Sequence, residues 1–388
     1  MRYDFDEIVV RKGTKSYKWD GQKYSFKKDG LLPFWVADSD FKTPHEVTEA
    51  LTERIEHGVF GYSVLEDDYF EASINWYRRR FGWKVEKEWI FPTCGVVTSI
   101  SYAIRAFTNK GDKVLIHTPV YGPFFKVVIK NNRQLIESEL KFNGQRYEID
   151  FEDMEAKCAD GVKALLLCSP HNPVGRVWEK IELEKVISIC KKYGILIISD
   201  EIHADLVYKG HKHMPAGSFE DYADNTVVCM AASKTFNIPG LQTSNCIISN
   251  GKLREKFIDE VISTFVPEPN IIGIVATQVA YDKCEDWLEQ QLAYLKENLE
   301  ILADYCCRNL PEINVIKPEG TYLAWLDFRK LGKTNEELMA LLTEKGGVAL
   351  SDGLSFGDRG EGFMRFNFAC PRSMLLEGLE GIKKALCS

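Results

Sequence analysis

The run Val227-Val228-Cys229-Met230-Ala231-Ala232-Ser233-Lys234-Thr235-Phe236-Asn237-Ile238-Pro239-Gly240 leads an apolar segment directly into one lysine. Its first four residues have the composition of a buried strand, and the small residues before Lys234 leave room for a ligand. Pro239-Gly240 ends any regular element. A lysine here either extends into water or acts as a nucleophile, and the rest of the chain decides between these two interpretations.

The composition is that of a globular protein with about two to three domains. The chain has 388 residues, 45% of them hydrophobic, and a net charge of −8 without a dense Lys/Arg block. Such a charge does not attract nucleic acid or an anionic membrane, so we expect a small-molecule partner. The 11 cysteines show neither disulfide nor zinc spacing, and no apolar stretch is long enough for a signal peptide or a membrane span. These features predict reduced thiols and a cytoplasmic location.

Short apolar runs, each ending in polar or turn-forming residues, alternate with helical stretches. Residues 113–117, 162–168 and 194–199 have the continuous apolar character of strands buried on both faces. The pattern predicts an α/β fold with a mostly parallel central sheet flanked by helices. Ligands of such sheets bind beyond the carboxyl ends of the strands. Four chemically useful side chains follow strand ends and are expected on one rim: Tyr121, Asn172, Asp200 and Lys234.

Residues 91–95 are predicted to form a turn that leads into a helix. The N-terminus of that helix is built from Gly95, Val96 and Val97, whose free N–H groups can hold a phosphate, although every helix start offers the same.

The pattern changes after about residue 285 to long helices and two further strand-like runs, which predicts a smaller α+β domain. The expected division is an N-terminal segment, residues 1–44, that contributes to the small domain; a large cofactor-binding domain, 45–285; and the C-terminal small domain, 286–388.

The side chains at the rim suit pyridoxal 5′-phosphate (PLP). Lys234 would form the Schiff base, Asp200 would keep the pyridine nitrogen protonated, and Tyr121 would stack on the ring. Asn172 would donate to the phenolic oxygen, and Ser233 would join the helix N-terminus at the phosphate. Taken alone, the tyrosine fits a core position, the asparagine a turn and the aspartate a helix cap. Their combination favours the cofactor.

The order of these motifs resembles the fold-type I PLP-dependent aminotransferase superfamily, class I/II, over nearly the whole chain. The motifs are Tyr121, Ser-Pro-His-Asn-Pro-Val-Gly (169–175), Ser-Asp-Glu-Ile-His (199–203), Ser-Lys-Thr (233–235) and Arg-Phe-Asn (365–367). Within it, Trp-Val-Ala-Asp (35–38), Asp-Glu-Ile-His and Lys-Thr-Phe-Asn-Ile are similar to the cystathionine β-lyase, or C–S lyase, branch.

The resemblance implies a homodimer with shared active sites. Arg365 would bind the substrate α-carboxylate, Asp38 would lie beside the substrate, and Tyr62 would reach the partner subunit's phosphate site. His203 stands where many aminotransferases carry a tyrosine beside the cofactor oxygen, so the resemblance implies that it binds the cofactor, and Gln242 stands where they often carry a phosphate-binding arginine. Structural alternatives remain: an ion pair for Arg365, and turn capping for Asp38 together with Asp40.

The predicted reaction is β-elimination of a cysteine S-conjugate such as cystathionine. Lys234 would remove the Cα proton, with Asp200 and Tyr121 as its catalytic partners, and the products would be homocysteine, pyruvate and ammonia. Transamination with a 2-oxo acid is the alternative, since it would use the same lysine and arginine. A cofactor-binding protein with a regulatory partner is a third possibility.

Overall fold

The computed structural model describes residues 3–266 and 268–387. Helices in it are α1 (Tyr17–Asp20), α2 (Gln22–Ser25), α3 (His45–Glu56), α4 (Asp67–Phe81), α5 (Val96–Phe107), α6 (Pro123–Lys130), α7 (Phe151–Ala159), α8 (Lys180–Tyr193), α9 (Gly251–Ser263), α10 (Ile271–Lys283), α11 (Glu285–Asn309), α12 (Asn335–Glu344) and α13 (Arg372–Leu386). Strands are β1 (Leu32–Pro33), β2 (Ile90–Thr93), β3 (Lys113–Thr118), β4 (Gln134–Glu139), β5 (Lys141–Phe142), β6 (Tyr147–Glu148), β7 (Val162–Cys168), β8 (Leu196–Asp200), β9 (Thr226–Met230), β10 (Ser244–Ile247), β11 (Asn314–Ile316), β12 (Leu323–Asp327), β13 (Val348–Ala349), β14 (Ser351–Asp352) and β15 (Phe363–Asn367).

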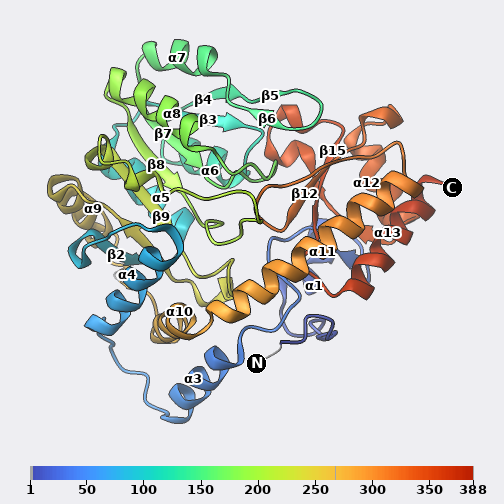
Figure 1. Cartoon of the computed structure of the whole chain (residues 1–388), viewed down its shortest axis with the longest axis horizontal. Helices are drawn as coiled ribbons and strands as arrows, with labels where there is room; N and C mark the ends of the chain where they lie inside the picture. The colour runs from blue at the N-terminus through green and yellow to red at the C-terminus, as the bar shows by residue number, and fades with distance from the viewer. Residues whose placement is uncertain (1–2, 267, 388) are drawn as a thin grey trace.

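A seven-stranded sheet with the order β2-β10-β9-β8-β7-β3-β4 forms the centre of the molecule (Figure 1). The pairs β4–β3, β3–β7, β7–β8 and β8–β9 are parallel, and β10 runs antiparallel to β9 and β2. The predicted α/β class with a mostly parallel sheet is therefore confirmed.

The apolar runs of the sequence supply two cores, one on each face of this sheet. Along β7, Ala164, Leu166 and Cys168 enter one core, whereas the alternate residues Leu165 and Leu167 enter the other. Helices α5, α6 and α9 contribute to the first core, and α4, α7, α8 and α10 contribute to the second. Successive strand residues point to opposite faces, so a strand covered on both sides must be apolar at every position.

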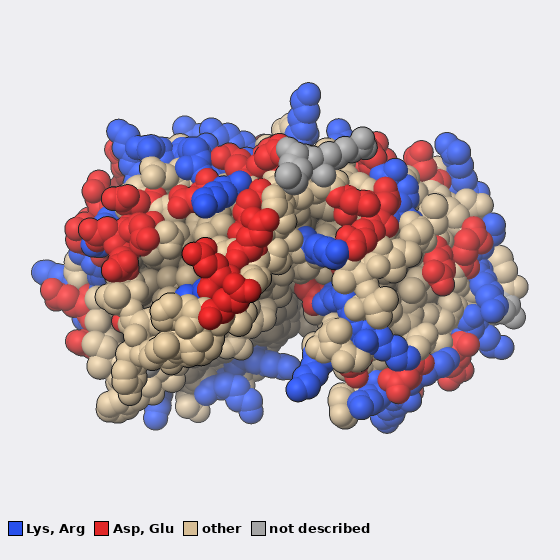
Figure 2. All heavy atoms as spheres, turned by 90° about the horizontal axis from the view of Figure 1, so that it is seen from below, with Lys and Arg blue, Asp and Glu red and all other residues tan. Residues whose placement is uncertain are grey.

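A second sheet, with the order β11-β12-β15-β14, is antiparallel and lies with α11, α12 and α13 (Figure 1). The N-terminal segment packs with this C-terminal part of the chain, because its strand β1 pairs in parallel with β13. Acidic and basic side chains are intermixed on the face shown in Figure 2, which is hollowed between its two lobes. None of the helices in the described ranges has the length and apolar character needed to cross a membrane.

The prediction of a turn at residues 91–95 is wrong for its first part. Residues Ile90–Thr93 form strand β2, which pairs antiparallel with β10 at the edge of the central sheet. Pro92 suggests a turn, but a proline is tolerated on an edge strand, where one backbone N–H group has no ladder partner to lose.

Candidate active site

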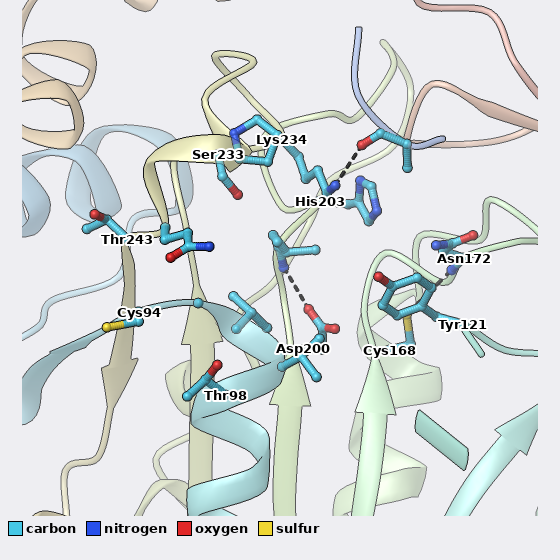
Figure 3. Close-up of a pocket in the computed structure, with 17 residues that line it drawn as sticks. Cys94, Thr98, Tyr121, Cys168, Asn172, Asp200, His203, Ser233, Lys234 and Thr243 are labelled. Carbon is cyan, nitrogen blue, oxygen red and sulfur yellow. Dashed lines mark hydrogen bonds between the residues drawn. The ribbon is translucent and has the colours of Figure 1, made fainter. Parts of the chain in front are cut away.

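The carboxyl ends of four parallel strands bring the predicted side chains into one cavity of about 200 Å³. Tyr121 follows β3, Asn172 follows β7, Asp200 ends β8, and Lys234 follows β9. Figure 3 shows these side chains around the cavity, with helix α5 entering beside Asp200. The cavity is lined by Ala37, Cys94, Gly95, Val96, Val97, Thr98, Tyr121, Cys168, Asn172, Asp200, Ile202, His203, Ser233, Lys234, Pro239, Gln242 and Thr243.

Lys234 is a half-buried lysine without a carboxylate partner among the described residues. Its Nζ donates a hydrogen bond to the carbonyl oxygen of Ala37 at 2.6 Å, and the hydroxyl of Tyr322 donates to the same oxygen at 3.0 Å. Burial lowers the pKa of Lys234 to about 8, partly offset by the charge of Asp38. An amine with this pKa is about one-tenth unprotonated at pH 7, far more than an ordinary lysine, and this makes it a better nucleophile and base.

Asp200 is a buried carboxylate that forms no ion pair with any described residue. Its Oδ1 accepts a hydrogen bond from the backbone N–H of Ile202 at 3.1 Å, so the capping role considered from the sequence is also present. Burial raises the pKa of Asp200 to about 7, opposed by this hydrogen bond and by the charge of Lys234. A carboxylate held in this way is stabilised by a cationic N–H group placed beside it.

The remaining predicted groups on this rim are an aromatic ring, an amide and an imidazole. Burial raises the pKa of Tyr121, and its half-buried ring forms one wall of the cavity. The Oδ1 atom of Asn172 accepts a hydrogen bond from Arg365 at 3.1 Å. His203 is fully enclosed, its Nδ1 has no hydrogen-bond partner among the described residues, and burial lowers its pKa to about 3, so the ring is neutral.

The N-terminus of α5 faces the same cavity. Gly95 precedes this helix with φ at +151°, a conformation that side-chain-bearing residues rarely adopt. The first N–H groups of a helix have no partner within it, and the helix dipole adds positive potential there. Ser233, Thr98 and Thr243 add hydroxyl groups to this end of the cavity. Such a set of donors fits a phosphate group.

Arg365 lies outside this cavity and lines the cleft that adjoins it, together with Lys234 and Tyr121. Arg365 is 95% buried, and its guanidinium donates to the carbonyl oxygen of Trp35 at 2.7 Å and to the hydroxyl of Ser351 at 3.1 Å, while its Nε has no partner among the described residues. Burial lowers its pKa only to about 10, so it stays charged at neutral pH. The acceptors of Arg365 among the described residues are an amide, a backbone carbonyl and a hydroxyl, and none is a carboxylate, so the alternative of a structural ion pair is not supported.

Asp38 does not line the cavity; the carbonyl of its neighbour Ala37 does. Arg11 binds the Asp38 carboxylate through two nitrogens, at 3.0 and 2.9 Å, and also bonds Asp40 at 2.7 Å. Lys18 completes the cluster with a 2.6 Å bond to Asp40. The two carboxylates therefore bind cations of the N-terminal segment, and turn capping does not account for them.

Tyr62 also lies away from the cavity of its own chain. It sits in the segment between α3 and α4, and its side chain is fully exposed to solvent. Its expected role at a partner's site needs a second chain and stays a prediction.

The residues present fit PLP. The α5 N-terminus suits the phosphate, Asp200 a protonated ring nitrogen, the Tyr121 ring an aromatic face, and Lys234 an aldehyde. Sequence reasoning missed seven lining residues: Ala37, Cys94, Thr98, Cys168, Ile202, Pro239 and Thr243. A backbone carbonyl or a small side chain gives no chemical signal in a sequence, so only the strand-end position of Cys168 pointed to this rim.

Comparisons with known proteins agree with this geometry. The model of the family "aminotransferase class I and II" matches residues 32–382. The chain is 42% identical to cystathionine beta-lyase PatB of Bacillus subtilis, over 99% of this chain and 100% of that protein. Cystalysin of Treponema denticola, whose crystal structure contains PLP, superposes with a TM-score of 0.97 at 39% identity, over 100% and 99% of the two chains. The PLP-bound C–S lyase of Staphylococcus hominis superposes with a TM-score of 0.93 at 35% identity, over 100% and 99%.

Proposed function

This chain belongs to the class I and II aminotransferase family, and we propose that it is a PLP-dependent C–S lyase of the cystathionine β-lyase type. Its substrates are thioethers of cysteine, and it releases a thiol, pyruvate and ammonia. The observation that carries the proposal is a set of charged groups that have hydrogen-bond partners but no ion-pair partner among the described residues. Lys234 and Asp200 share one cavity, and Arg365 lies in the adjoining cleft.

Each unpaired charge matches one feature of the cofactor or the substrate. Bound PLP supplies an aldehyde that bonds to amino groups and a protonated ring that accepts electrons from the substrate Cα. Asp200 would keep the ring nitrogen protonated, and Tyr121 would supply an aromatic surface beside the cofactor. Arg365 binds the α-carboxylate with its planar fork, oriented by Asn172 at 3.1 Å. These contacts would hold the substrate in the cleft that Lys234 also lines.

Lys234 performs the proton transfers. Its unprotonated amine takes the Cα proton, and the C–S bond then breaks so that the sulfur leaves with the bonding pair. The leaving thiolate acquires a proton and departs as a thiol. Addition of one water to the remaining three-carbon fragment yields pyruvate and ammonium. A pKa of about 8 lets Lys234 hold and release a proton in the same pH range.

One assay tests the reaction class. Cystathionine is incubated with PLP-loaded enzyme, with and without a 2-oxo acid, and pyruvate, free thiol and amino acid products are followed. Elimination gives stoichiometric pyruvate and thiol without any 2-oxo acid. Transamination gives a new amino acid only when the 2-oxo acid is present, and this outcome would overturn the proposal in favour of an aminotransferase.

The assembly that we propose is a homodimer in which Tyr62 of one subunit contacts the cofactor phosphate of the other. The exposed Tyr62 side chain and the exposed Val59 and Phe60 beside it support this arrangement, as does Gln242 at a position where an arginine is common. Mixing Tyr62→Ala and Lys234→Ala subunits should restore activity, because one heterodimer site carries both defects and the other carries none. Inactivity after proven subunit exchange would contradict the shared site.

We also propose a cytoplasmic location and the domain division at residues 44 and 285. The free thiols of the described cysteines support a reducing compartment. Separate sheets before and after α11, and the pairing of β1 with β13, support the domain division.

A further inference from the structure

Residues 34–41 form an irregular segment, without helix or strand, that contacts two of the charged groups of the site. The carbonyl oxygen of Trp35 accepts a hydrogen bond from Arg365 at 2.7 Å, and that of Ala37 accepts one from Lys234 at 2.6 Å (Figure 3). These two carbonyls lie two residues apart. The backbone of this segment therefore links the expected carboxylate binder to the expected base.

Asn367 holds the backbone on both sides of Ala37. It is completely buried on β15, two residues after Arg365, so the two side chains leave the strand on the same face. Its Nδ2 donates to the carbonyl oxygens of Val36 and Asp38, both at 2.6 Å. The carbonyl of Ala37 therefore lies between two peptide groups that one buried amide holds in place.

A second asparagine holds the residues that follow. Asn237 lies three residues after Lys234 and has φ at +57°. Its Nδ2 donates to the carbonyl oxygens of Ser39 and Phe41 at 3.1 and 2.8 Å, and its Oδ1 accepts the Ser39 N–H at 3.1 Å. One asparagine thus follows Lys234 and the other follows Arg365, and both bond the segment that these two charges share.

We propose that Asn367 and Asn237 are positioning residues, which hold the Ala37 carbonyl so that it orients the amine of Lys234 for proton transfer. This inference rests on the proposed C–S lyase function, in which Lys234 is the base. An amine whose N–H group is held by a fixed acceptor has fewer orientations available. A displacement of about 1 Å in a reacting group costs about a hundredfold in rate.

The ionisable side chains around the amine of Lys234 are Asp38, Tyr121, Asp200, His203, Tyr322 and Arg365. The carboxylates of Asp38 and Asp200 raise the pKa of the amine, and the guanidinium of Arg365 lowers it. The Ala37 carbonyl also favours the protonated amine, because a hydrogen bond to a charged form stabilises that form.

Loosening of the segment would withdraw the Ala37 carbonyl and Asp38 together, and both changes lower the pKa of Lys234. We therefore expect a variant whose amine is less protonated and whose proton transfer is nevertheless slower. A general loss of stability does not produce this combination.

The kinetics of Asn367→Ser and Asn237→Gly measure the positioning. Serine is too short to bond both carbonyls, and glycine tolerates the positive φ of residue 237. Asn367→Ser should lower kcat for elimination about 10- to 100-fold and change KM less than about threefold, since Arg365 keeps its bonds to Asn172 and Ser351. Asn237→Gly should lower kcat by a smaller factor.

Labelling of Lys234 with acetic anhydride in the cofactor-free protein measures its protonation without turnover. The labelled peptide is quantified by mass spectrometry as a function of pH. The pH midpoint of the labelling should fall by about one pH unit in Asn367→Ser, because a hydrogen bond to a charged group has about this strength. Asn237→Gly should move the midpoint in the same direction.

Asn298→Ser is the matched control. Asn298 on α11 is as completely buried as Asn367, and its Nδ2 also donates to two carbonyl oxygens, those of Phe368 and Cys370. Neither of these two residues is among the described residues that line the cavity or the cleft. The control should lose a similar amount of thermal stability and keep the wild-type kcat and labelling midpoint.

The outcomes separate the two proposals. If the wild-type enzyme eliminates no thioether, the C–S lyase function itself fails. The positioning role requires both a lower kcat and a lower labelling midpoint in Asn367→Ser, and an unchanged value of either overturns it while the lyase function stands. Equal changes in Asn298→Ser also overturn it, because they would trace the effect to lost stability. If Asn367→Ser does not fold, Asn237→Gly decides by the same two measurements.

Discussion

Two lysines of this chain, one completely buried and one half-buried, occupy opposite electrostatic settings. Lys18 is completely buried, with its Nζ 2.6 Å from Asp40 and 3.7 Å from Asp38, and Arg11 bonds both carboxylates. Lys234 has a backbone carbonyl as its acceptor and no carboxylate partner among the described residues. The positive charge of Lys18 is neutralised by carboxylates of the same chain. The amine of Lys234 has no such carboxylate within ion-pair distance among the described residues.

This difference distinguishes a structural cluster from a reactive site. A buried charge without a partner is costly, so a protein retains it where a ligand or a reaction needs it. Lys18 also donates a hydrogen bond to the backbone carbonyl of Asp38. The bonds of Lys18 and Arg11 therefore hold the N-terminal segment in place, with the carbonyl of the adjacent Ala37 beside Lys234. Under the proposed function, Lys234, Asp200 and Arg365 would each be matched by a group of the cofactor or the substrate.

Substitutions of Lys234 and Lys18 should produce the largest effects, the first on turnover and the second on the stability of the fold. Lys234→Ala should reduce elimination at least about a thousandfold, because the base is lost, while the fold is retained. Lys18→Met should instead lower the free energy of unfolding by about 3–5 kcal/mol, because Asp40 loses its closest cation. Steady-state kinetics and urea denaturation measure the two effects. Near-native turnover by Lys234→Ala would refute its assigned role.

Asp200→Asn should stabilise the cofactor-free protein. The folded-state pKa of Asp200 is about 7, above its ordinary 3.8, so the folded protein binds more protons than the unfolded chain between these values and loses stability as pH rises. The variant should therefore gain at most about 4 kcal/mol above pH 7 and nothing near pH 4. With PLP bound, the same variant should lose turnover by orders of magnitude. Equal stability at pH 8 would show that Asp200 carries no burial penalty.

Arg365→Lys should lower kcat/KM for amino acid substrates about 10- to 100-fold, mainly through KM, because an ammonium cannot reproduce a two-nitrogen fork on a carboxylate. Arg329→Lys is the control, since Arg329 already binds Asp327 within the chain and should leave the kinetics unchanged. Unaltered kinetics with a lower melting temperature in Arg365→Lys would assign that residue to structure alone.

The sequence predicted the strand-end residues because strands buried on both faces are recognisable as continuous apolar runs. Asn172, Asp200 and Lys234 follow such runs, and the parallel order of β7, β8 and β9 places them together. The partners of Asp38 were not predictable, because Arg11 and Lys18 come from an irregular segment without periodicity. Contacts such as the Ala37 carbonyl depend on tertiary packing, which leaves no local pattern. The catalytic and binding roles of the site residues stay predictions.

The most direct test of the account asks which lysine bonds to PLP. The PLP-loaded enzyme is reduced with borohydride, which fixes the cofactor to its lysine, and the digested protein is analysed by mass spectrometry. We predict the added mass on the peptide that contains Lys234 and on no peptide that contains Lys18. A label on another lysine, or a PLP-loaded protein without any label at Lys234, would contradict the assignment of the unpaired lysine as the reactive group.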